Sequence, residues 1–91
     1  MSIEYDEAKR QWTLEERGLD FLDAVKVFEA LEMELVDDRF PYGEIRIISF
    51  GQIDDRPVAV VWTSKGENVR RVISMRHVHD REIKARRRAM D

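Results

Sequence analysis

The sequence predicts an α+β domain in which a two-helix hairpin packs on a mainly antiparallel sheet, in the order β-α-α-β-β-β-β-α. Residues 21–31 carry apolar side chains at the spacing of one helix face. Residues 58–62 (VAVVW) are apolar without alternation, which is typical of a central strand covered on both faces. Turn residues at 64–68 (SKGEN) join this run to a second, antiparallel strand. A chain of 91 residues allows one domain, residues 1–91, with one modest core.

The first predicted helix comes after a short edge strand at residues 2–5. Asp6 can accept backbone N–H groups as its N-cap, and Gly18 stands in the position of a C-cap. Within this helix, Ala8 and Trp12 are spaced to face inward.

The second predicted helix begins at Asp20, which can cap it. Helical spacing favours core packing for its apolar stripe over a ligand-binding surface. The stripe consists of Phe21, Ala24, Val25, Phe28 and Leu31. Joined at Gly18, the two helices form the hairpin that covers one face of the sheet.

Two strands are predicted before the central one, at residues 33–39 and 44–53, with a loop containing Pro and Gly at 40–43. Gly51 lies inside the second of these strands. A glycine there indicates a bulge or the close approach of another backbone.

Residues 68–75 (NVRRVISM) predict a strand, with three arginines in it or directly after it and two histidines just beyond. In a regular strand, Arg71 and Arg76 lie on opposite faces because side chains alternate. An arginine among apolar neighbours needs an anion for its guanidinium group. For a single arginine, an internal carboxylate is favoured as the partner over an external phosphate. The clustering of three arginines and two histidines strengthens the case for a phosphate, although a carboxylate stays the favoured partner.

The last predicted helix, residues 80–91, carries a dense set of cations on a thin apolar stripe. Such a charge run is more often a solvated face than a binding site. Residues 1–45 have thirteen acidic and five basic side chains, whereas residues 46–91 have six and eleven. This asymmetry indicates one face suited to polyanions.

Composition excludes several classes of protein. The chain has no cysteine, so it has no disulfide framework and no thiolate metal site. His77 and His79 are two residues apart and lack further ligands, so we predict no metal and no cofactor. The acidic N-terminus and the absence of an 18-residue apolar run predict a cytoplasmic protein without membrane contact.

Four segments resemble the BrnT family, the ribonuclease toxins of type II toxin–antitoxin modules. They are EYDEAK at 4–9, RGLDFLDAVKVF at 17–28, GEIRIISFG at 43–51 and VRRVISMR at 69–76. The resemblance spans nearly the whole chain. It implies a RelE-like fold and a growth-inhibiting endoribonuclease.

The same resemblance implies a protein partner. That partner is a BrnA-like antitoxin with a ribbon-helix-helix DNA-binding region. The resemblance suggests a toxin–antitoxin heterotetramer, and it implies that operator DNA is contacted only through the antitoxin.

RNA cleavage without a metal requires proton transfers and a stabilised phosphorane. The candidates for phosphate stabilisation are Arg46, Arg71 and Arg76, and His77 is the candidate acid–base group. The candidates for binding RNA are Arg70, His79, Arg81, Lys84, Arg87 and Arg88. The basic last helix could instead receive the antitoxin.

Two other functions remain open at this point. Family members usually read K-H-G where this chain has Glu16, Arg17 and Gly18. The chain could therefore be a catalytically weak or inactive toxin-fold protein that acts as an antitoxin-binding module or corepressor. A housekeeping RNA-binding domain without a partner is the third hypothesis.

Overall fold

The computed structural model describes residues 1–90, with the side chains of residues 1–89. Residue 91, which the predicted last helix included, lies outside the described residues. The elements in chain order are β1 (Ser2–Glu4), α1 (Glu7–Arg17), a 3₁₀ turn (Phe21–Asp23), α2 (Ala24–Glu29), β2 (Met33–Asp37), β3 (Arg46–Ile53), β4 (Arg56–Ser64), β5 (Val69–His77) and α3 (Asp80–Met90).

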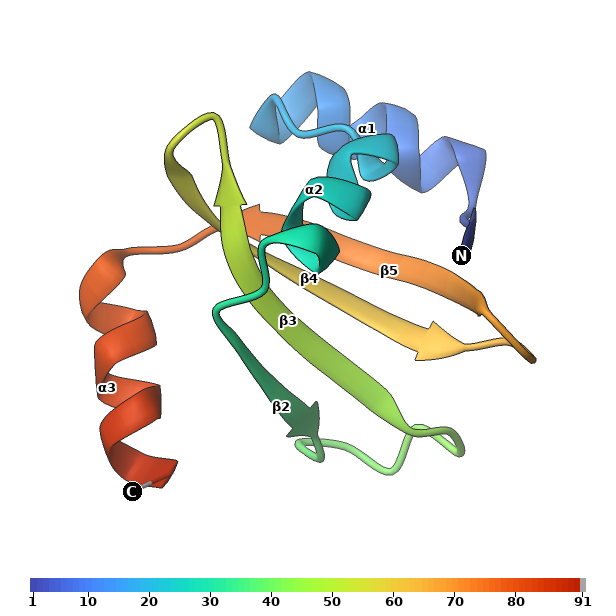
Figure 1. Ribbon diagram of the computed structural model, residues 1–91. Coiled ribbons are helices and arrows are strands. Elements are labelled where there is room, and N and C mark those ends of the chain that lie inside the picture. Colours follow the sequence, from blue (N-terminus) through green and yellow to red (C-terminus); the bar gives the residue numbers. More distant parts are fainter. Residues whose placement is uncertain (91) are drawn as a thin grey trace.

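The five strands form one mixed sheet in the order β1-β5-β4-β3-β2. The pairs β2–β3, β3–β4 and β4–β5 are antiparallel, and β1 pairs with β5 in parallel. The edge position predicted for residues 2–5 is therefore confirmed, as is the α+β class. Figure 1 shows α1 and α2 on one side of the sheet and α3 on its own beside β2 and β3.

The predicted caps of α1 are confirmed. The Asp6 carboxylate accepts from the Lys9 N–H at 3.1 Å, and Gly18, at φ 67°, donates its N–H to the Leu14 carbonyl at 3.0 Å. The inward orientation predicted for Ala8 and Trp12 is wrong, because both residues are exposed, Trp12 by 52%. Thr13 is the buried residue of α1, since this helix packs against the margin of β5 rather than across the sheet.

The second helix is shorter than its apolar stripe predicts. Asp20 does cap, through the Leu22 N–H at 2.9 Å, but the residues after it form a 3₁₀ turn, and α2 ends at Glu29. Val27, which the predicted stripe does not include, is fully buried. Leu31, which the stripe does include, lies beyond the helix and is 45% exposed.

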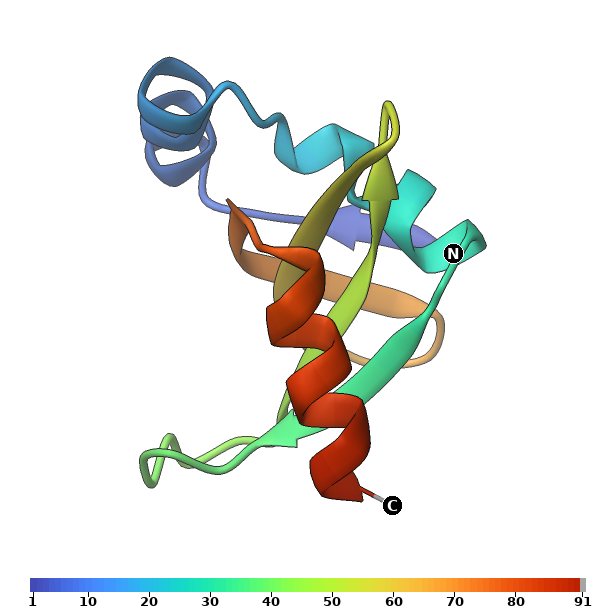
Figure 2. The same ribbon diagram turned by 90° about the vertical axis from the view of Figure 1, so that its left-hand side faces the viewer.

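Two apolar cores lie on opposite faces of the sheet. The core under α1 and α2 includes Phe21, Ala24, Val27, Val58, Val60, Val72 and Met75. The core under α3 consists of Met33, Ile48, Phe50, Ala59, Val78 and Ile83. Successive residues of β4 alternate between the two cores, which explains the unbroken apolar run of this strand. Figure 2 shows α3 crossing the second face.

Asp37 ends β2 with a buried carboxylate that anchors the adjoining loop. Its oxygens accept from Arg39 Nε at 2.7 Å, Arg39 Nη2 at 2.9 Å and the Tyr42 hydroxyl at 3.1 Å. The hydrogen bonds from Arg39 are the main reason that the pKa of Asp37 falls to about 2, from an ordinary value of 3.8.

We expect Asp37→Asn to lower the free energy of unfolding by about 1–3 kcal/mol near neutral pH, because three charge-assisted bonds are weakened. Since the folded-state pKa is depressed, the stabilisation is present above about pH 4 and is lost as the pH falls toward about 2. Urea unfolding at several pH values checks this: the wild type and Asp37→Asn should converge in acid. A difference independent of pH would contradict the assignment.

Candidate nucleic-acid interface and active site

A β-bulge in β5 changes which arginines share a face of the sheet. Val61 pairs with Ser74, but Trp62 pairs with Val72, so Ile73 is an extra residue. The alternation of side chains therefore shifts by one at this point. The prediction that Arg71 and Arg76 lie on opposite faces is wrong for this reason.

Three arginines lie on the face that α3 partly covers. Thr63 pairs with Arg46 on one side and Arg71 on the other, and Arg76 pairs with Ala59 of the α3-side core. Residues paired directly across strands point to the same face. We call this surface, with Arg46, Arg71 and Arg76, the arginine face. It unites the three residues that the sequence nominated for phosphate stabilisation.

One row crosses the arginine face with one residue from each strand. In spatial order the row is Asp37, Arg46, Thr63, Arg71 and Glu4. Neighbouring strands are roughly 5 Å apart, so Arg46 and Arg71 arise roughly 10 Å from each other. Thr63 between them is buried and donates its hydroxyl to the Ile45 carbonyl at 2.7 Å.

Each arginine of this face has a partly exposed carboxylate as its partner. Arg71 Nη1 lies 2.7 Å from Glu4, and Arg46 Nε lies 3.1 Å from Glu44. Arg76 donates twice to Glu82, at 2.9 and 3.3 Å, and these bonds are the main reason that the pKa of Glu82 is lowered. Exposed ion pairs contribute about 0–1 kcal/mol each, so an incoming phosphate can compete for these guanidinium groups.

Arg46 is also oriented by an aromatic ring. Its guanidinium carbon lies 3.9 Å from the centre of the Tyr42 ring, and Tyr42 in turn donates to Asp37. This stack holds a side chain that would otherwise sample many rotamers.

Arg70 and His77 lie on the other face. Arg70 stacks over Phe28 at 4.5 Å and Trp62 at 4.2 Å. His77 pairs with Val58 of the α1–α2 core, and its Nε2 lies 3.2 Å from the Arg17 carbonyl. Its Nδ1 is buried and has no hydrogen-bond partner within the described part of the chain. The structure therefore does not bring His77 together with the three arginines.

The cations of α3 border the arginine face. His79 precedes the helix, and Arg81, Lys84, Arg87 and Arg88 are exposed on it. Arg87 donates to the Glu32 carbonyl at 3.2 Å, which ties the helix to the start of β2. Arg86 was not a candidate; it lies 3.7 Å from Glu82 and over the Phe50 ring.

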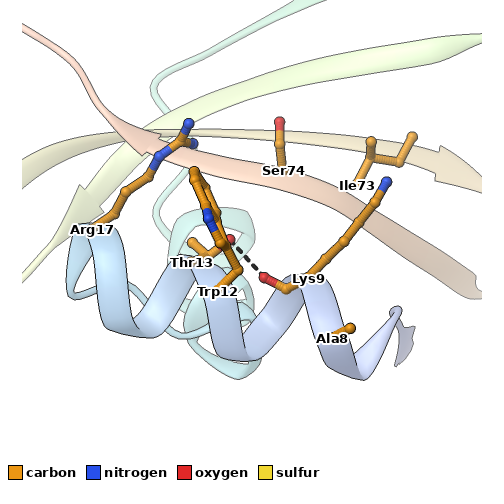
Figure 3. Close-up of a pocket in the computed structure, with 7 residues that line it drawn as sticks. All are labelled: Ala8, Lys9, Trp12, Thr13, Arg17, Ile73 and Ser74. Atoms are coloured by element: carbon orange, nitrogen blue, oxygen red, sulfur yellow. Dashed lines mark hydrogen bonds between the residues drawn. The ribbon is translucent and has the colours of Figure 1, made fainter.

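A pocket of about 370 Å³ lies between α1 and β5, and sequence reasoning missed it. Figure 3 shows Lys9, Trp12 and Arg17 extending from α1 toward β5, where Ile73 and Ser74 project. One signal was available in the sequence: three of the four positions three or four residues from Trp12 are charged, so this indole has almost no apolar helix neighbour.

Metal-binding clusters and membrane-spanning helices are both absent from the described residues. No three His, Cys, Asp or Glu side chains among them are grouped as they would be to hold a metal ion. None of their helices is long and apolar enough to cross a membrane.

The strands and helices form a small α+β domain with three arginines on one face of its sheet. Residues 5–82 match the family model described as the ribonuclease toxin BrnT of type II toxin–antitoxin systems. The chain belongs to this family. The crystal structure of the Brucella abortus ribonuclease toxin BrnT superposes with a TM-score of 0.67 at 29% identity, over 88% of this chain and 99% of that one. No curated protein sequence matches the chain.

Proposed function

We propose that this member of the BrnT ribonuclease toxin family is a metal-independent endoribonuclease that acts in the cytoplasm and inhibits growth. The observation that carries the proposal is the bulge at Ile73, because it leaves Arg46, Arg71 and Arg76 on one face of the sheet. Family membership supplies the reaction class.

In this proposal the arginines act on the phosphate. Negative charge develops on the non-bridging oxygens as the 2′-hydroxyl attacks, and guanidinium groups donate two parallel N–H bonds to such oxygens. Arg71 and Arg46 flank the buried Thr63, and Arg76 stands farther along β5. The carboxylates of Glu4, Glu44 and Glu82 occupy the guanidinium groups until a phosphate of the RNA displaces them.

His77 is the proposed acid–base group, and its geometry imposes a condition. Its Nε2 faces the Arg17 carbonyl and its Nδ1 is buried, so proton transfer to RNA requires the ring to turn. We expect His77→Ala to slow cleavage by about 100-fold, the usual contribution of a general acid or base. An unchanged rate in the variant would remove His77 from the mechanism.

The remaining cations would hold the RNA backbone. Arg81, Lys84, Arg87 and Arg88 line α3, His79 leads into it, and Arg70 lies on the opposite face. Because phosphate contacts release counterions, binding to these residues should weaken steeply with salt.

An antitoxin is the proposed protein partner. The family implies an antitoxin, and we propose that it is a BrnA-like ribbon-helix-helix protein that neutralises the toxin in a heterotetramer. Operator DNA would then be contacted through the antitoxin alone.

The purified chain should cleave RNA in the presence of EDTA and leave a 2′,3′-cyclic phosphate, because the 2′-hydroxyl is the nucleophile. A substrate with 2′-O-methyl groups throughout is the matched control and should stay intact. Cleavage that occurs only with added divalent cation would refute metal independence.

A second candidate function is a non-catalytic antitoxin-binding module or corepressor. The observation in its favour is that each arginine of the arginine face already has a carboxylate partner, while His77 lies elsewhere. Intact RNA in the same assay, together with a stable complex with the antitoxin, would select this function.

A further inference from the structure

We propose that the pocket between α1 and β5 binds one unpaired base of single-stranded RNA, stacked on Trp12 and flanked by Lys9 and Arg17. This inference rests on the proposed function only in taking RNA as the ligand. It assigns a role to a pocket that the phosphate chemistry of the arginine face does not use.

The indole is exposed and also held in place. Arg17 Nη1 donates to the Met75 carbonyl at 2.7 Å, and its guanidinium carbon lies 5.0 Å from the centre of the Trp12 ring. Arg17 thereby links α1 to β5 and limits the rotation of the indole. An aromatic ring fixed in this way offers a π-face to a base without a large loss of side-chain entropy.

The lining of the pocket has the composition of a base-binding site. Ala8, the Trp12 indole and Ile73 supply apolar surface, and the Lys9 ammonium stands at the rim (Figure 3). Thr13 is buried with its hydroxyl on the Lys9 carbonyl at 2.8 Å. Apolar walls with a few polar groups at the rim suit a planar heterocycle, and the cations suit its phosphate.

One lining residue of the pocket, Ser74, lies on the arginine face. Ser74 lines the pocket and pairs with Val61, which belongs to the arginine-face side of β4. It therefore lies between Arg71 and Arg76 on the same face of β5. An RNA strand whose phosphates contact these arginines can turn one base over the edge of β5 onto Trp12.

Charge favours RNA over a protein segment as the occupant. The cations Lys9 and Arg17 line the pocket, and Arg71 and Arg76 stand on either side of its lining residue Ser74 along the same face of β5. The charged side chains that line the pocket are both cations, which favours a ligand that carries phosphate, and an exposed aromatic ring stacks with any base.

The test uses intrinsic fluorescence, because the protein has only two tryptophans. In Trp62→Phe, Trp12 is the single tryptophan, and its emission can be excited apart from that of the two tyrosines. Titration with a 2′-O-methyl oligoribonucleotide, which lacks the attacking hydroxyl, should quench this signal. In a Trp12→Phe protein, where Trp62 remains, the same titration should change the fluorescence much less, because Arg70 and Phe28 cover the Trp62 ring and leave no face for a base.

Affinity measurements then distinguish a base that stacks on Trp12 from a structural role of this side chain in the fold. Trp12→Ala and Trp12→Leu should each weaken oligonucleotide binding by roughly tenfold, whereas Trp12→Phe should retain most of the affinity because it keeps a ring. Since Trp12 is half exposed, thermal unfolding should confirm that all three variants remain folded.

The outcomes distinguish this inference from the proposed function. Full RNA affinity in Trp12→Ala, with affinity lost in Arg71→Ala, overturns the base pocket and leaves the ribonuclease intact. Quenching of Trp12 without any cleavage of an unmodified substrate supports the pocket and refutes the ribonuclease. Quenching by the antitoxin but not by RNA overturns the inference in favour of a protein site.

Discussion

Replacing Arg71 with alanine is expected to slow RNA cleavage by about 100-fold, the loss typical of removing one donor to a developing oxyanion. Arg71 is central to the arginine face, because it is two strands from Arg46 and precedes Arg76 on the same strand. The rate of cleavage by purified protein, at saturating and at low RNA, measures the effect. Arg71→Lys should recover little of the lost cleavage rate, because an ammonium group cannot form the bidentate contact with phosphate.

Glu4→Gln is the matched control for this prediction. It breaks the same ion pair, which joins Arg71 Nη1 to Glu4 at 2.7 Å, but it keeps the guanidinium group. If Arg71 acts on phosphate, Glu4→Gln should cleave RNA at least as fast as the wild type. An equal loss of cleavage rate in Arg71→Ala and Glu4→Gln would mean that this ion pair stabilises the pairing of β1 with β5 instead.

Replacing Gly51 with valine is expected to lower the free energy of unfolding by about 1–3 kcal/mol, the usual cost of overpacking. Gly51 lies in β3 directly beneath the end of α2. A Cβ atom at this position would lie 3.1 Å from the Val27 carbonyl oxygen, the Ala30 carbonyl oxygen and a Val27 methyl group. Two of these three neighbours are backbone atoms, so the helix itself would have to move. The sequence prediction of a close backbone approach is thereby confirmed.

Urea unfolding followed by circular dichroism measures this change. Gln52→Val is the control, because it puts the same side chain at the next position of β3, where the residue is exposed. It should change the stability by no more than about 0.5 kcal/mol. A Gly51→Val protein as stable as the wild type would show that α2 can shift without cost.

The features that the sequence determined by itself are those encoded locally. The caps of α1 depend on Asp6 and Gly18, whose side chain and backbone act within one turn of the helix. The central position of β4 results from an apolar run that only a doubly covered strand can bury. The resemblance to BrnT likewise rests on contiguous segments, and the family match confirms it.

The arrangement of the candidate site was decided by tertiary structure. The bulge at Ile73 arises from how β5 aligns with β4, a pairing between distant segments that leaves no local mark in VRRVISMR. It moves Arg76 to the face of Arg71 and His77 to the other. Trp12 is exposed for a similar reason: α1 packs against the margin of β5, so its buried strip narrows to Thr13. Periodicity predicts which side chains share a helix face or strand face, but the packing partner decides which face is covered.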